Sequence, residues 1–141
     1  MNDATVGAQS SVEQVLIDLL ASFLATNGVS VATGFSFSQK LFDSRVVSIE
    51  KDSGLLISSS EDAIFAAITS GAYPRGHYVS RLVANRIFRS LEQINSQGGS
   101  AFLRQLSASS KSEIRSQLLP LYGVGDKFIS SYLLLAGIEE S

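Results

Sequence analysis

A short glycine turn between two apolar segments near the C-terminus constrains this chain more than any other feature. The first apolar segment ends at Pro120, which has no backbone N–H and therefore stops a helix. Gly123 and Gly125 then enclose Val124, and two glycines let the backbone turn tightly and pass close to a neighbouring surface. A second apolar segment, residues 128–137, follows at once. The pattern predicts two helices joined by a tight turn.

The start of the second of these helices would suit an anion. Because the first N–H groups of a helix have no partner inside it, they favour a bound anion, above all a phosphate. Two helices joined by such a turn have the layout of a helix-hairpin-helix, which grips a nucleic-acid backbone. We therefore predict that Gly123, Val124 and Gly125 present backbone N–H groups to a phosphate.

The charges of the chain are unevenly distributed along it. A net charge of −2 argues by itself against nucleic-acid binding. However, residues 1–72 carry three basic and eight acidic side chains, whereas residues 73–138 carry eight basic and three acidic ones. Such a split indicates a surface that faces a polyanion. Arginines that are merely solvated on helix surfaces would give the same counts, so both interpretations stay open.

Composition limits the class of protein and its chemistry. With 141 residues, 45% of them hydrophobic and 17% charged, the chain is predicted to be one globular domain with a real core. The absence of cysteine excludes disulfides and thiolate-held metal or iron–sulfur centres. A single histidine, His77, argues against a zinc site. We therefore expect no cofactor and no metal.

Two further observations bear on localisation. The apolar runs are shorter than the roughly 20 residues of a membrane span, so no membrane partner is expected. The N-terminus has no basic region before an apolar core, so no signal peptide is predicted. The expectation is a soluble intracellular protein, cytoplasmic or nuclear.

Hydrophobic periodicity predicts a mainly α protein, a compact helical bundle that contains the helix-hairpin-helix. Residues 1–10 are small and polar and are expected to form a flexible tail, with a single helical domain over residues 11–141. Apolar residues recur at three- and four-residue steps from residue 12 to 24, which predicts a helix capped by Ser11. Further helices are predicted at residues 63–70, after a serine cap within residues 58–60, and at residues 79–96, 101–106 and 111–119, the last with a capping box between Ser110 and Glu113.

Residues 29–60 give a less regular pattern. Residues 29–37 alternate apolar and small side chains, which favours a strand or an extended loop, and Ser38 is a candidate cap for a short helix after it. Two apolar runs, residues 46–50 and 55–57, flank a turn-forming segment. They are compatible with a small β-hairpin within residues 29–57, or with helix ends.

From about residue 60 to 137, the order of elements resembles the helix-hairpin-helix DNA glycosylase superfamily, which includes endonuclease III. The matching pieces are a short helix that ends at residues 71–73, a basic helix at 81–89, a Gly-Gly-x-x-Phe-Leu segment at 98–103, and a helix that leads into the glycine turn. Family members typically carry Leu-Pro-Gly-Val-Gly-x-Lys-Thr-Ala where this chain has Leu-Tyr-Gly-Val-Gly-Asp-Lys-Phe-Ile, residues 121–129. The resemblance implies a DNA-binding domain related to base-excision enzymes.

The resemblance also implies roles for particular residues. Lys127 falls where bifunctional family members keep a nucleophilic lysine, whose amine attacks the sugar C1′ and forms a Schiff base. It is therefore the candidate catalytic residue and a candidate DNA contact. Arg75, Arg81 and Lys111 are candidate supplementary contacts to the DNA backbone, which carry no sequence information.

The departures from the family favour binding over catalysis. Family enzymes use a carboxylate a short way past the lysine helix, and no residue up to Ser141 matches it. The iron–sulfur loop is absent, and Tyr122 stands where the family has proline. The favoured prediction is a DNA-binding domain that grips the backbone through residues 123–127. The alternatives are a DNA glycosylase or AP lyase that uses Lys127, and an interaction protein whose apolar helices bind a second copy or another protein chain.

Overall fold

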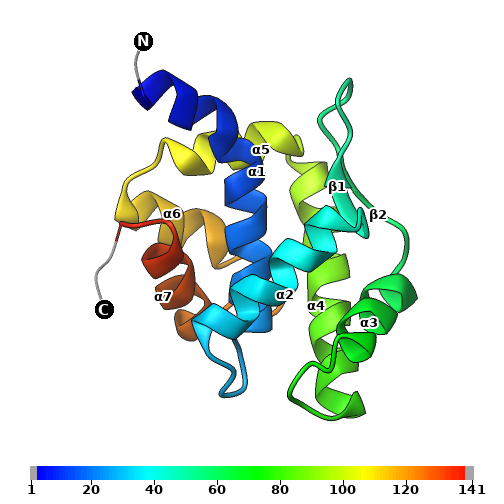
Figure 1. Ribbon diagram of the computed structural model, residues 1–141. Helices are drawn as coiled ribbons and strands as arrows, with labels where there is room; N and C mark the ends of the chain where they lie inside the picture. Colours follow the sequence, from blue (N-terminus) through cyan, green and yellow to red (C-terminus); the bar gives the residue numbers. More distant parts are fainter. Residues whose placement is uncertain (1–2, 139–141) are drawn as a thin grey trace.

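The computed structural model describes the backbone of residues 3–138 and the side chains from Val12 onward (Figure 1). Within these residues it contains seven helices and one two-stranded antiparallel hairpin, which confirms the predicted mainly helical class. The elements are α1 (Asp3–Leu24), α2 (Val31–Asp43), β1 (Val47–Ile49), β2 (Leu56–Ser58), α3 (Glu61–Ser70), α4 (His77–Ser96), α5 (Ser100–Ser107), α6 (Lys111–Leu118) and α7 (Asp126–Leu135). None of the helices in this range is long and apolar enough to cross a lipid bilayer.

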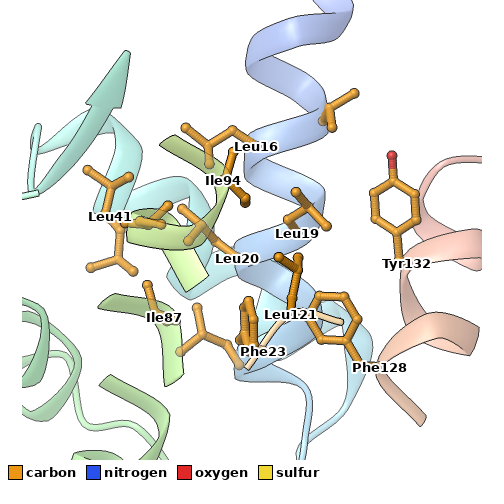
Figure 2. Packing of buried hydrophobic residues seen from close by; sticks show 14 of the residues in the cluster. Leu16, Leu19, Leu20, Phe23, Leu41, Ile87, Ile94, Leu121, Phe128 and Tyr132 are labelled. Carbon is orange, nitrogen blue, oxygen red and sulfur yellow. The ribbon is translucent and has the colours of Figure 1, made fainter. Parts of the chain in front are cut away.

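Helix α1 lies at the centre of the molecule, with α2, α4, α5 and α7 packed around it (Figure 1). Its side chains are buried without interruption from Val15 to its end at Leu24, as expected for a helix enclosed on every side. Figure 2 shows leucines of α1 facing Leu41 of α2 and Ile94 of α4 on one side. On the other side, Phe23 meets Phe128 of α7 edge-on, with ring centroids 4.5 Å apart.

The predicted β-hairpin is confirmed. β1 pairs with β2, with Val47 opposite Ser58 and Ile49 opposite Leu56. The side-chain amide of Asn95 on α4 holds β2 in place, because it accepts from the Leu56 N–H at 2.7 Å and donates to the Leu56 carbonyl at 2.8 Å. The hairpin is thereby attached to the helical core.

The prediction of a strand or extended loop at residues 29–37 is wrong, because α2 occupies Val31–Asp43. Its N-cap is Ser30, whose hydroxyl accepts from the Thr33 N–H at 3.1 Å. The predicted cap, Ser38, instead lies inside the helix, where its buried hydroxyl donates to the carbonyl of Ile17 on α1 at 2.6 Å.

Close packing of α2 on α1 explains this error. A Cβ at Gly34 would lie 2.6 Å from the backbone carbonyl of Ala21, so the missing side chain lets the two helices approach each other. Alternation of small and apolar residues favours a strand only locally, and contact with a neighbouring helix overrides that preference.

The first helix begins at Asp3, whereas the sequence predicted its start at Ser11. Helix propagation adds one hydrogen bond for each residue once a nucleus exists, so a long helix can extend beyond the segment that packs. Residues 1 and 2 of the predicted flexible tail lie outside the described residues, and the mobility of residues 1–10 stays a prediction.

Two of the later helices, α3 and α6, begin at serine caps. The Ser60 hydroxyl accepts from the Ala63 N–H at 3.0 Å at the start of α3. At the start of α6, the Ser110 hydroxyl accepts from the Glu113 N–H, and the Glu113 carboxylate accepts from the Ser110 N–H at 2.7 Å. The capping box is therefore present as the sequence predicted.

One ionisable side chain lies within the buried stretch of α1. Asp18 is only 3% exposed, and its carboxylate accepts one hydrogen bond, from the Gln14 amide at 2.9 Å. Burial raises the pKa of Asp18 to about 6, against a smaller lowering by the Gln14 hydrogen bond. In the unfolded chain the carboxyl ionises near its ordinary value of about 3.9.

We expect Asp18→Asn to remove a pH dependence of stability. Between about pH 4 and pH 6 the folded state binds the extra proton, so the free energy of unfolding of the parent falls as the pH rises through this window. At pH 8 the variant should be more stable by about 1 to 3 kcal/mol. Urea denaturation at pH 4 and pH 8 measures this difference.

Asp43→Asn provides the matched control. Asp43 accepts from the Gln39 amide at the same four-residue spacing, but it is exposed at the end of α2. Its substitution should change the free energy of unfolding by less than about 0.5 kcal/mol at either pH. An Asp18→Asn variant with the pH dependence of the parent would contradict the assignment.

Candidate nucleic-acid interface

The glycine turn connects α6 to α7 and is anchored at both of its ends. Leu121 is buried and lies beside Phe128 in the core (Figure 2). Within the turn, the Leu121 N–H donates to the Leu118 carbonyl at 3.0 Å, and the Val124 N–H donates to the Leu121 carbonyl at 3.2 Å. The turn is therefore a folded segment with its own hydrogen bonds.

Two polar side chains of α4 hold the middle of the turn. The Gln93 carbonyl oxygen accepts from the Tyr122 N–H at 2.6 Å, and its amide donates to the Pro120 carbonyl at 3.2 Å. The Ser90 hydroxyl donates to the Tyr122 carbonyl at 3.0 Å. Because residues three apart share a helix face, one face of α4 fixes three backbone groups of the turn.

The two glycines of the turn differ in their surroundings. Gly123 has a left-handed backbone, and a Cβ there would lie 2.8 Å from the side chain of Arg86, so glycine is required by the protein itself. Gly125 has an extended backbone that any residue can adopt, and a Cβ there would meet no atom within 4 Å. The space in front of Gly125 is open to solvent.

Gly125 is the N-cap of α7, and no side chain caps this helix. The first intrahelical hydrogen bond runs from the Ile129 N–H to the Gly125 carbonyl at 3.1 Å, so the N–H groups of residues 126–128 have no helical acceptor. Among the described residues, the N–H groups of Gly123 and Gly125 have no acceptor either. Of the three predicted donors, only Val124 is already engaged within the turn.

Three cationic side chains lie on the turn or at the start of α7. Arg86 crosses over Gly123, and the Arg89 guanidinium lies 4.5 Å from the ring centroid of Tyr122. Lys127 is exposed in the first turn of α7. We define the hairpin face as residues 122–125 together with Arg86, Arg89 and Lys127.

A polar hollow adjoins the hairpin face. It has a volume of about 330 Å³ and lies between Tyr122 and the exposed side of α4, where Arg89, Glu92, Gln93 and Ser96 line it. Because Tyr122 is 41% exposed, an aromatic surface borders this hollow next to the open helix end.

The carboxylate nearest to Lys127 in the sequence is already engaged. Asp126 pairs with Arg115 of α6, and both side chains are at least half exposed. An exposed pair of this kind contributes at most about 1 kcal/mol to stability. Its effect on the hairpin face is to neutralise the one acidic side chain in the first turn of α7.

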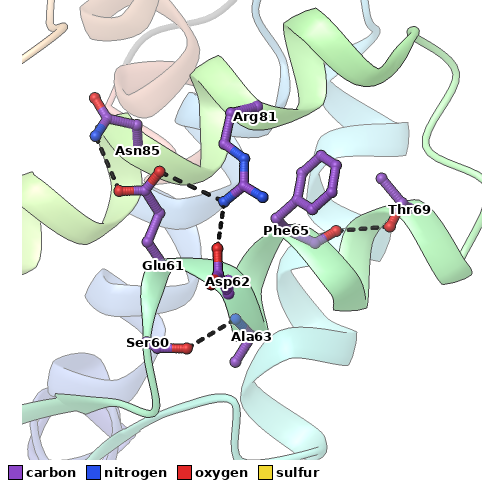
Figure 3. A network of polar contacts seen from close by, with 8 residues as sticks. All are labelled: Ser60, Glu61, Asp62, Ala63, Phe65, Thr69, Arg81 and Asn85. Atoms are coloured by element: carbon purple, nitrogen blue, oxygen red, sulfur yellow. Dashed lines mark hydrogen bonds and ion pairs between the residues drawn. The ribbon is translucent and has the colours of Figure 1, made fainter.

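Two of the predicted supplementary contacts lie away from the hairpin face. Arg81 forms ion pairs with Asp62 at 2.7 Å and with Glu61 at 3.6 Å, and its guanidinium lies over the Phe65 ring (Figure 3). Its charge thus helps to join α4 to α3. Arg75 lies in the loop before α4, and its guanidinium donates to the carbonyl of Asn27 at 2.7 Å.

The third supplementary contact, Lys111, is exposed at the first residue of α6. The hairpin face lies beyond the other end of α6. With a rise of about 1.5 Å per residue, that end is about 10 Å from Lys111. The structure therefore brings Lys127 together with the three turn residues, while Arg75, Arg81 and Lys111 are separate from them. Their contact with DNA stays a prediction.

Sequence reasoning gave no role of their own to Arg86 and Arg89, the two arginines that do adjoin the turn. The available signal was their spacing from Ser90 and Gln93, which places all four on one face of the predicted helix. Only the packing of that face against the turn distinguishes them from Arg81.

Comparisons with protein families, with curated proteins and with solved structures find no match for this chain.

We expect Gln93→Ala to loosen the turn without disturbing the core. The change removes both hydrogen bonds of Gln93 to the turn and should lower the free energy of unfolding by about 1 kcal/mol. The Tyr122 amide should exchange with solvent about five to ten times faster. Hydrogen exchange followed by NMR measures this rate.

Gln105→Ala is the control, because Gln105 is exposed on α5 and no side-chain hydrogen bond of it is found among the described residues. It should leave the Tyr122 amide unchanged. Equal exchange rates in Gln93→Ala and the parent would show that α4 does not hold the turn.

Proposed function

We propose that this protein binds the phosphate backbone of DNA through the hairpin face. The observation that carries the proposal is the open N-terminus of α7, where Gly125 leaves space for a close approach and several N–H groups lack acceptors. A phosphate placed there would accept from these N–H groups and would be favoured by the helix dipole.

The surrounding cations support the same function. Arg86 and Arg89 adjoin the turn from α4, and Lys127 is exposed in the first turn of α7, so three positive charges are available for phosphate contacts. Asp126, which would repel DNA, is paired with Arg115. Contacts of this kind are independent of base sequence, so binding should tolerate any duplex sequence.

Binding should weaken steeply with salt. If three cations each displace a counterion, the logarithm of the association constant should fall against the logarithm of salt concentration with a slope of about −2 to −3. Arg86→Ala and Arg89→Ala should each make the slope shallower by about 1. Fluorescence anisotropy of a labelled duplex between about 25 and about 200 mM salt measures the slope.

Gly125→Glu tests the open helix end directly. The extended backbone at Gly125 accepts any residue, and an added carboxylate at a helix N-terminus stabilises the helix, so the variant should fold. The same carboxylate should repel a phosphate and weaken DNA binding by at least about tenfold, or 1.4 kcal/mol.

Gly76→Glu is the matched control, since Gly76 is the N-cap of α4, also without a side-chain cap and with no atom within 4 Å of its Cβ position. It should bind DNA as the parent does. A loss of binding in Gly76→Glu with normal binding in Gly125→Glu would contradict the proposal, as would affinity that does not change with salt.

Lyase chemistry at Lys127 is tested separately from binding. We expect no covalent adduct with abasic duplex DNA on treatment with borohydride, because the described residues after Lys127 include no carboxylate that could activate its amine, and Asp126 before it pairs with Arg115. A trapped adduct that disappears in Lys127→Ala would show an enzyme in place of a binding domain. Lys127→Arg keeps the charge and should keep the affinity, which separates the two roles.

A further inference from the structure

A second hollow lies on the protein at the other end of α7 from the open helix terminus. It is enclosed by α1, α5 and α7 and has a volume of about 210 Å³. Four buried side chains form its floor: Val15, Asp18, Leu106 and Tyr132. Its rim is formed by more exposed residues, Gln14, Ser107, Ala136 and Ile138.

The floor of this hollow contains a carboxylate that has no cation beside it among the described residues. Asp18 is 3% exposed, and among the described residues its only partner is the Gln14 amide. None of the lining residues that the structure describes is basic. Because a buried charge is costly unless it is paired, the hollow is built to favour a positive charge that comes from outside.

Tyr132 supplies a second polar group on the same floor. Burial and the charge of Asp18 raise the pKa of the Tyr132 hydroxyl well above its ordinary value, so this hydroxyl stays protonated near neutral pH. A phenol of this kind can donate one hydrogen bond and accept another. Figure 2 shows the Tyr132 ring on α7 beside α1, and Asp18 of α1 lines the same hollow.

The other two side chains of the floor are apolar. Leu106 is fully buried and Val15 is 5% exposed, while Ile138 lies half exposed on the rim. A dry cavity of about 150 Å³ in a protein core binds benzene. A hollow of about 210 Å³ therefore has room for a ring of that size with a short charged substituent.

We propose that this hollow binds a small organic cation, an ammonium or amidinium group on a compact apolar body. The cation would donate to the carboxylate of Asp18, and the Tyr132 hydroxyl would accept from the same group. The apolar body would pack against Leu106 and Val15. The site is separate from the hairpin face, so the proposal does not depend on DNA binding.

Isothermal titration calorimetry with benzylammonium tests the site, with benzyl alcohol as the uncharged probe of similar shape. At pH 7.5, benzylammonium should bind at least about tenfold more tightly than benzyl alcohol, a difference of 1.4 kcal/mol. Asp18→Asn should abolish this preference, and Asp43→Asn should keep it. Equal affinity for both probes in the parent protein would overturn the proposal.

The pH dependence gives a second test that needs no variant. Tyr132 is the other titratable group among the described lining residues, and α5 contributes none. Because Asp18 has a pKa of about 6, lowering the pH from 7.5 to 5 should protonate it and weaken benzylammonium binding about tenfold. Binding that is unchanged at pH 5 would contradict the role of Asp18.

The source of the cation is tested with a peptide-like probe, N-acetyl-lysine amide. Its ammonium sits on a long flexible stem, so it should bind more weakly than benzylammonium to a compact hollow. Tighter binding of the lysine probe would overturn the small-molecule assignment and place the cation on a partner protein.

Discussion

The enclosure of α1 on every side is the constraint on which the rest of the structure depends. Ten consecutive side chains of this helix, from Val15 to Leu24, are buried, so its neighbours are placed by the need to cover it. Its polar residues must then find partners inside the protein. Ser22 donates back to the carbonyl of Asp18 at 2.7 Å, and the Asp18 side chain faces the hollow between α5 and α7. The same enclosure thus produces both the packed core and an unusual buried carboxylate.

The position of the glycine turn follows from this core. Leu121 and Phe128 lie on either side of the turn, and both are buried beside α1, so the two ends of the turn are fixed by apolar contacts. Gln93 and Ser90 fix its middle. The open N-terminus of α7 is therefore held in one place before any ligand arrives. A site that is ordered in advance does not lose binding free energy to the ordering of its own backbone.

Much of the fold could be predicted from the sequence where local signals and packing agree. Ser60 and Ser110 start helices as their capping patterns indicate. At α2 the local pattern and the packing disagree, because Gly34 serves a close helix contact that no periodicity reveals. The site shows the same limit. The turn was visible in the sequence, but the choice among Arg81, Arg86 and Arg89 depends on which face of α4 packs against α3 and which against the turn.

Chemical-shift mapping by NMR tests the central claim most directly, because it reports which backbone N–H groups meet the DNA. A titration of labelled protein with a short duplex of arbitrary sequence should shift the amides of residues 123–128 first. The amides of Gly76 and His77, at the equally open start of α4, should remain unchanged at the same ratio. Shifts that are largest at the start of α4, or that leave residues 123–128 unaffected, would contradict a phosphate site at the hairpin face.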